Sequence, residues 1–293
     1  MRIALATATE ARALDEDLPP LVAALAERGA AVDVWAWDDP NAAWDDRDAV
    51  VVRSTWDYAP RRDEFVAWAR RVRSPLMNGA DVLAWNTDKR YLEHLAAHGV
   101  AVTPTRFVAP GDLPENAPTT PEGEFVVKPT ISGGAKDTAR YLPGEWMKAL
   151  EHIARLTAAG RTAMVQPYQA SVDARGETAL LFFGGVFSHA ITKGALLKRG
   201  AGPTEGLFAP ETVAARAPTS TERGIAEAAL DAVPMGRKNL AYARVDVVLG
   251  GDGAPMVLEL ELTEPSVFLR YEPTAAARFA DAILAGAARA KAR

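Results

Sequence analysis

Val-Leu-Glu-Leu-Glu-Leu, residues 257–262, is an apolar strand pattern that glutamate interrupts twice. Side chains alternate between the two faces of a strand, so Glu259 and Glu261 lie on the same face. Residues 244–248, Arg-Val-Asp-Val-Val, predict a second strand, and the Gly-Gly-Asp-Gly sequence between the two is typical of a β-hairpin turn. Pairing across this hairpin would bring the carboxylate of Asp246 to face those of the two glutamates.

Three carboxylates on one strand pair repel one another unless a cation lies between them. Oxygen donors without Cys or His favour Mg²⁺ or Mn²⁺, and phosphate oxygens can complete the coordination. We therefore interpret Asp246, Glu259 and Glu261 as Mg²⁺ ligands. The alternative is a solvent-facing strand surface, on which alternating glutamates are common.

The first part of the chain alternates short apolar runs with helical patterns. Residues 3–6, 32–37 and 49–52 predict strands, and residues 15–28 predict an amphipathic helix. Strand–helix–strand alternation implies a parallel sheet covered by helices. We expect an N-terminal α/β domain over residues 1–90.

The rest of the chain divides into a helix-and-strand part and a strand-rich part. Further strands are predicted at 100–108, 124–129, 162–166, 178–183, 186–192, 241–249 and 255–262. Further helices are predicted at 88–98, 146–160 and 221–233, and from Pro273 onward. We expect a central domain over 91–170 and a C-terminal domain over 171–293.

Composition excludes several classes of function. The 293 residues carry a net charge of −5, which argues against a nucleic-acid partner. There is no cysteine, so disulfides, thiolate metal sites and cysteine nucleophiles are excluded. No apolar run approaches the roughly 20 residues of a membrane span. We expect a cytoplasmic protein without a membrane partner.

Three features predict a phosphate site. Lys89 lies at the start of the helix predicted for 88–98, where backbone amides favour anions. Lys128 ends an apolar strand, so its ammonium group must leave the core or find an anion. The loop Ser132-Gly133-Gly134 can present several amides to one phosphate. The alternatives are a solvated helix lysine, an edge-strand lysine and an ordinary turn.

Gln166, Pro167 and Tyr168 end the strand predicted at 162–166. Exposed backbone at such a position can hydrogen-bond to adenine, and Asp173 could hold the ribose hydroxyls. The alternative is an ordinary strand exit with a capping aspartate.

The order of these features resembles the ATP-grasp superfamily over residues 86–270. The resemblance implies an α/β fold in three parts: a parallel N-terminal domain, a small lid domain and an antiparallel C-terminal domain. It also implies ATP and Mg²⁺, with Lys89 and Lys128 as phosphate ligands and Asp173 as a ribose ligand. The late motif of the superfamily is Glu-x-Asn, whereas this chain has Glu261 in place of Asn.

Three segments are similar to the cyclo-ligases that close O-ureido-D-serine to D-cycloserine, an antibiotic. They are Arg-Ser-Thr-Trp-Asp-Tyr (53–58), Ser-His-Ala-Ile-Thr-Lys (188–193) and Glu-Leu-Thr-Glu-Pro-Ser (261–266). This resemblance implies that a carboxylate is activated as an acyl phosphate and attacked by a nitrogen of the same molecule, with release of ADP, phosphate, CO₂ and ammonia. The alternatives are an amino acid or peptide ligase that joins two substrates and a nucleotide-binding protein without turnover.

Two cations are interpreted as catalytic. A guanidinium group holds planar oxyanions with two donors, so we expect Arg244 to orient the carboxylate or the transferred phosphoryl group. We expect Lys193 near the γ-phosphate. The alternatives are an ion pair of Arg244 with Asp246 and a surface position for Lys193.

We expect the ligand to be a small amino acid substrate. We also expect a second copy of the chain to be the protein partner, in a homodimer. Ligands gather beyond the carboxyl ends of parallel strands, which is where the segment after residue 52 lies. The residues expected to bind substrate are Arg53, Ser54, Thr55, Asp57, Tyr58 and Ser266. The alternative for the 53–58 segment is a loop with capping residues.

Overall fold

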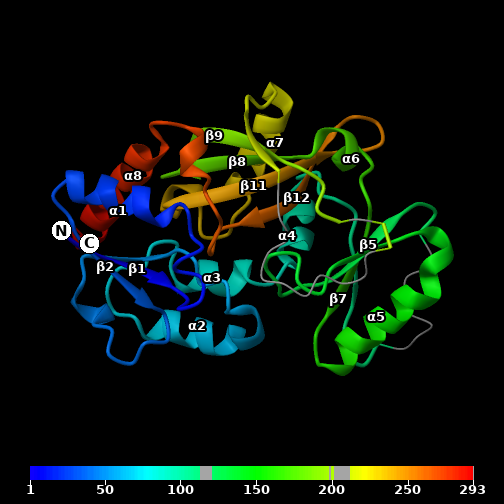
Figure 1. Cartoon of the computed structure of the whole chain (residues 1–293), viewed down its shortest axis with the longest axis horizontal. Helices are drawn as coiled ribbons and strands as arrows, with labels where there is room; N and C mark the ends of the chain where they lie inside the picture. The colour runs from blue at the N-terminus through cyan, green and yellow to red at the C-terminus, as the bar shows by residue number, and fades with distance from the viewer. Residues whose placement is uncertain (113–120, 198, 201–211, 293) are drawn as a thin grey trace.

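The chain folds around three β-sheets (Figure 1). The computed structural model describes residues 1–112, 121–197, 199–200 and 212–292. Within this part, no helix is both long and apolar enough to cross a membrane. The three sheets fall within the segments 1–90, 91–170 and 171–293, and we propose these as the domain limits.

The N-terminal sheet is parallel, as predicted. It consists of β1 (Arg2–Thr7), β2 (Ala31–Ala36) and β3 (Ala49–Val52), in the order β2-β1-β3. Alternate side chains of β1 and β3 pack against α1 (Leu18–Glu27) and α8 (Ala275–Lys291) on one face. The opposite face is covered by α2 (Arg62–Arg71) and α3 (Ala80–Asn86).

Helix α8 belongs to the last part of the sequence but packs on the first sheet. It lies beside α1, where Arg28 forms a 2.5 Å ion pair with Asp281 (Figure 1). The last helix therefore joins the N-terminal layer, and the proposed third domain is not spatially separate.

The central sheet is antiparallel and carries one helix. Its strands are β4 (Arg106–Val108), β5 (Phe125–Pro129), β6 (Ala139–Tyr141) and β7 (Ala163–Pro167), in the order β4-β7-β5-β6. Phe125 and Val127 pack against helix α5 (Trp146–Ala158). Lys128 therefore lies on the opposite face with Val126, as alternation predicts.

The C-terminal sheet is antiparallel and has five strands. They are β8 (Glu177–Phe183), β9 (Val186–Lys193), β10 (Val213–Arg216), β11 (Tyr242–Leu249) and β12 (Pro255–Glu261), in the order β10-β9-β8-β11-β12. Helix α7 (Ser220–Asp231) packs on it, and Thr219 and Glu222 form its N-terminal capping box. Both predicted hairpins, β8–β9 and β11–β12, are confirmed.

The prediction of one helix at 88–98 was wrong at its start. Helix α4 begins only at Tyr91 (Tyr91–Ala97), and Asn86 ends the preceding helix α3. The side chain of Asn86 donates to the carbonyl of Leu260 and accepts from the amide of Leu262. Four short helices and strands were not predicted: α3, β6, β10 and α6 (Ser171–Arg175).

A buried histidine couples the stability of the central sheet to pH. His152 on α5 is 4 % exposed and is hydrogen-bonded to the hydroxyl of Tyr141 at 3.0 Å. Burial, and then the charge of Arg155, lower the pKa of His152 to about 4. Because the unfolded chain binds a proton near pH 6.5 and the folded chain does not, this stability is present above pH 6.5 and is lost as the pH falls toward 4.

We expect the free energy of unfolding of the wild type to fall by about 2–3 kcal/mol more than that of His152→Phe between pH 7.5 and 4.5. Urea unfolding at the two pH values measures the difference. His98→Gln, which changes an exposed histidine, is the control. Equal pH dependence of wild type and His152→Phe would contradict the assignment.

Candidate functional site

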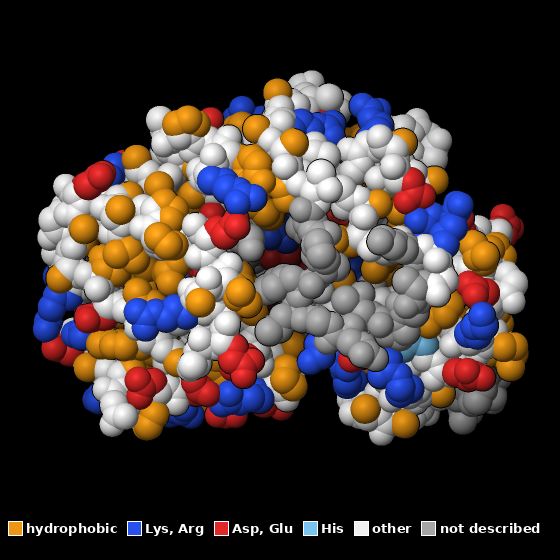
Figure 2. All heavy atoms as spheres, viewed as in Figure 1, with side chains coloured by type: hydrophobic (Ala, Val, Ile, Leu, Met, Phe, Trp, Pro, Cys, Tyr) orange, Lys and Arg blue, Asp and Glu red, His pale blue; other side chains and the backbone are white. Residues whose placement is uncertain are grey.

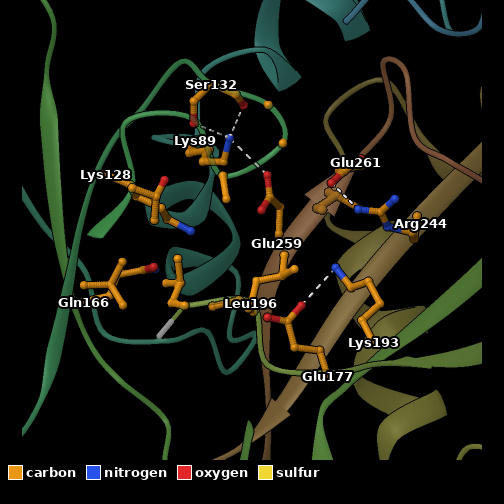
Figure 3. Close-up of a pocket in the computed structure, with 18 of the residues that line it drawn as sticks. Lys89, Lys128, Ser132, Gln166, Glu177, Lys193, Leu196, Arg244, Glu259 and Glu261 are labelled. Carbon is orange, nitrogen blue, oxygen red and sulfur yellow. Dashed lines mark hydrogen bonds and ion pairs between the residues drawn. The ribbon is translucent and has the colours of Figure 1, made fainter. Parts of the chain in front are cut away.

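One cavity lies where the central and C-terminal sheets meet the N-terminal domain. Figure 2 shows acidic and basic side chains at the bottom of a hollow near the centre of the face that it displays. The wall includes both predicted lysines, the glycine loop, the strand-end hinge and the two late glutamates (Figure 3). The predicted site residues on this wall are Tyr58, Lys89, Lys128, Ser132, Gly133, Gly134, Gln166, Pro167, Tyr168, Lys193, Arg244, Glu259, Glu261 and Ser266.

The β11–β12 register confirms the predicted strand pairing. Asp246 is opposite Glu259, and Arg244 is opposite Glu261. Glu259 and Glu261 reach the cavity, whereas Asp246 is 1 % exposed and does not line it. The solvated strand surface that we considered as an alternative is therefore excluded.

Each carboxylate of the predicted trio is held by a cation. Asp246 accepts from Lys193 at 2.6 Å and from Arg244 at 2.9 Å, Glu259 pairs with Lys89 at 3.0 Å, and Arg244 also pairs with Glu261. In the part of the chain that the structure describes, no three carboxylate or imidazole groups are positioned as they stand to hold a metal ion. Lys193 and Arg244 occupy the oxygens of Asp246 in this structure, and the role of the trio as Mg²⁺ ligands stays a prediction.

The charges of the two glutamates fit a cation site. Burial alone would raise the pKa of Glu259, but Lys89 and Lys128 outweigh it and lower that pKa. Burial, and then repulsion by Glu259 and Asp246, raise the pKa of Glu261 to about 7 against the effect of Arg244. Neighbouring carboxylates destabilise the ionised form of such a group, and a divalent cation between them stabilises it. Glu259 and Glu261 therefore fit Mg²⁺, whereas Asp246 lies behind two cations.

The two lysines occupy different electrostatic situations. The ammonium group of Lys89 donates to the carbonyl of Ser132 at 2.7 Å and pairs with Glu259, which links the glycine loop to β12. Lys128 is 9 % exposed, and burial lowers its pKa. Among the described residues Lys128 has no hydrogen bond or ion pair, although it lines the cavity. A buried ammonium group without a counter-charge is stabilised when it binds an anion from solution.

The hinge residues line the cavity, with Asp173 behind them. The hydroxyl of Tyr168 donates to Asp173 at 2.6 Å, and the guanidinium of Arg140 donates to both oxygens of Asp173. Hydrogen bonds from Arg140 and Tyr168 lower the pKa of Asp173 to about 2. Asp173 is absent from the cavity wall as the structure describes it, and its ribose contact stays a prediction.

Both predicted catalytic cations reach the cavity. Lys193 is 7 % exposed and lies between Asp246 and Glu177, at 2.6 and 2.9 Å. This burial excludes the alternative of a surface lysine. Arg244 forms the ion pair with Asp246 that we considered as an alternative, and it also reaches Glu261 and the cavity.

Four of the five residues predicted to bind substrate in the 53–58 segment do not line the cavity, whereas Tyr58 does. Arg53, Ser54 and Thr55 are each 0 % exposed and do not line the cavity. Arg53 donates to the carbonyl of Pro265 at 3.1 Å, beneath α8. Asp57 accepts from the indole of Trp37 at 2.8 Å. Asp57 does not line the cavity either, so the contact of these four residues with substrate stays a prediction.

Several wall residues were missed by the sequence interpretation. Glu177 pairs with Lys193, and Glu264 lies on the wall beside Tyr58. Trp56 and Phe268 add aromatic surface. The quoted motifs contained Trp56 and Glu264, but no local pattern indicated that their side chains would face a cavity.

A buried aspartate fixes the loop after β12. Asp17 is 5 % exposed and accepts hydrogen bonds from the amides of Val267, Phe268 and Leu269 at 2.7–3.0 Å. Phe268 has a φ of 51°, which is unfavourable for a bulky side chain. Asp17 thereby holds Phe268 and its neighbour Ser266 at the cavity wall.

We expect Asp17→Ala to lower the free energy of unfolding by about 3 kcal/mol, because three buried amides lose a charged acceptor. Urea unfolding measures this loss. Glu10→Ala, which removes an exposed carboxylate, is the control. A change below about 0.5 kcal/mol would mean that the loop does not depend on Asp17.

Comparison with known proteins identifies similar chains. Residues 3–78 match the family model described as the N-terminal domain of D-cycloserine synthetase DcsG. The cycloserine biosynthesis protein DcsG of Streptomyces lavendulae is 42 % identical over 294 residues, which cover 96 % of this chain and 97 % of that protein.

Solved structures share the fold. The crystal structure of D-cycloserine synthetase DcsG superposes with a TM-score of 0.88, at 41 % identity and 99 % coverage of both chains. The ATP complex of D-alanine–D-alanine ligase from Bacillus anthracis gives a TM-score of 0.68 at 15 % identity, with 100 % of this chain and 99 % of that chain covered. The second likeness concerns the fold alone.

Proposed function

The chain belongs to the D-cycloserine synthetase family of ATP-grasp ligases, and from this premise we propose that it cyclises O-ureido-D-serine to D-cycloserine. One observation carries the proposal for this chain: Lys89 and Lys128 of the early segments line the same cavity as the β12 glutamates, and Lys89 pairs with Glu259. A triphosphate and a carboxylate substrate can meet there.

ATP is expected to lie between the central and C-terminal sheets. The adenine would meet the backbone of Gln166 to Tyr168, with the ribose toward Asp173. The phosphates would meet Lys128 and Lys89 under the loop of Ser132, Gly133 and Gly134. Mg²⁺, when bound, would offset the charge of the phosphates, and Glu259 and Glu261 would hold it, with Asp246 behind them.

The proposed reaction has three steps: activation of the carboxylate, ring closure and loss of the carbamoyl group. A carboxylate oxygen of the substrate attacks the γ-phosphorus, ADP leaves, and an acyl phosphate forms. The ureido nitrogen bonded to oxygen then attacks the acyl carbon, loses its proton and expels phosphate, which closes a five-membered ring. Water cleaves the carbamoyl group, which leaves as CO₂ and ammonia. Because nucleophile and electrophile belong to one molecule, orientation supplies much of the rate.

Arg244 and Lys193 are positioned to bind the anions of these steps. Arg244 reaches the cavity beside Glu261, and its guanidinium is our assignment for the substrate carboxylate or the transferred phosphoryl group. Lys193 lies at the edge of the same wall and is our assignment for the γ-phosphate. Both cations pair with Asp246 in this buried site.

Incubation with O-ureido-D-serine, ATP and Mg²⁺ tests the proposal. We expect equal amounts of ADP and D-cycloserine, measured by a coupled assay and by mass. Omission of ATP and use of the L-enantiomer are the controls. ADP release that requires a second amine, with a linear dipeptide as product, would instead establish a ligase that joins two substrates.

A further inference from the structure

Every acidic side chain but one on the described cavity wall is paired with a cation. Glu177 pairs with Lys193, Glu259 with Lys89 and Glu261 with Arg244 (Figure 3). Glu264 also lines the cavity, but no Lys, Arg or His of the described residues lies within 4.0 Å of its carboxylate. The hydroxyl of Tyr58 lies beside this carboxylate and lowers its pKa.

The position of Glu264 is fixed by its neighbours on both sides. The indole of Trp56 donates to the carbonyl of Glu264 at 3.1 Å, and Arg53 donates to the next carbonyl, that of Pro265. These two hydrogen bonds hold the backbone from which the Glu264 side chain reaches the cavity wall. Burial, and then repulsion by Glu261, raise the pKa of Glu264 to about 8 against the effect of Lys89.

We propose that Glu264, with the Tyr58 hydroxyl beside it, binds the α-ammonium group of the amino acid substrate. This inference rests on the proposed function. An α-amino acid offers one cation, and its carboxylate is attached to the same carbon atom. An ammonium group at Glu264 would place that carboxylate toward Glu261 and Arg244, where activation is proposed. Glu264 would therefore select α-amino acids over acids that lack the amino group.

A site built for a charged group rejects an analogue without it, because the buried partner is left uncompensated. The analogue is 3-(ureidooxy)propanoate, which lacks the amino group. We expect the wild type to prefer O-ureido-D-serine over it by about 10²-fold or more in kcat/KM. In Glu264→Gln the ratio of the two kcat/KM values should fall below about tenfold. The fall should come from a lower kcat/KM for O-ureido-D-serine. Tyr58→Phe should shift the ratio in the same direction by less.

Calorimetry of the protein saturated with AMPPNP and Mg²⁺ measures the same preference for both ligands without turnover. If the wild type makes no cycloserine, the proposed function fails, and the binding ratio still decides the role of Glu264. AMPPNP affinity within twofold of wild type shows that Glu264→Gln is folded. Glu93→Gln, an exposed substitution on α4, should leave the ratio unchanged.

Two results would overturn the inference. One is an unchanged preference in Glu264→Gln. The other is a higher Mg²⁺ requirement with an unchanged preference, since Glu264 would then be a metal ligand.

Discussion

Replacing Glu259 by Gln is expected to lower kcat by about 10³-fold or more, the largest effect of any single substitution considered. The change removes a proposed Mg²⁺ ligand and leaves Lys89, its partner at 3.0 Å, buried without a counter-charge. ADP release under saturating substrate measures the loss. AMPPNP binding without metal should change far less, because the lysines and the hinge remain.

The matched control is Glu151→Gln, which changes an exposed glutamate on α5. It should retain wild-type turnover. A kcat of Glu259→Gln within tenfold of wild type would show that Glu259 does not serve the chemical step.

Replacing Lys128 by Met is expected to lower kcat/KM for ATP by about 10²- to 10³-fold. Lys128 is the buried cation of the cavity for which the described residues supply no ion pair, so a phosphate would be its counter-charge. The same substitution should raise the Tm of the unliganded protein, because an isolated buried charge is removed. The increase in Tm on addition of ATP should become smaller.

Lys148→Met is the control, since Lys148 is an exposed lysine of α5. It should alter neither ATP affinity nor the response to ATP. Unchanged ATP affinity in Lys128→Met would contradict the assignment of this lysine to the phosphates.

Local patterns predicted the parts of the site that depend on one strand or one hairpin. Alternation placed Glu259 and Glu261 on one face and Lys128 opposite Phe125 and Val127, and the structure confirms both. The hairpin between β11 and β12 then brought Asp246 opposite Glu259. These relations follow from the two-residue alternation of side chains along a strand. They can therefore be predicted without knowing where distant segments of the chain lie.

Contacts between distant segments account for what the sequence did not predict. Arg53 follows a buried parallel strand, as a ligand-binding residue would, but a loop 212 residues later supplies its acceptor. Asn86 resembles a helix cap, yet it pairs with the backbone of β12. The sequence did not indicate a role for Glu264 in binding substrate. That role depends on the fold, which pairs the other glutamates of the cavity wall with cations and leaves Glu264 without one among the described residues.

Transfer of ¹⁸O tests carboxylate activation most directly. O-ureido-D-serine labelled with ¹⁸O in its carboxylate is converted with ATP and Mg²⁺, and the released phosphate is analysed by mass. We predict one ¹⁸O atom in each phosphate, because the carboxylate oxygen that attacks the γ-phosphorus leaves with it. Phosphate without ¹⁸O, formed together with cycloserine, would contradict an acyl phosphate and with it the account of this site.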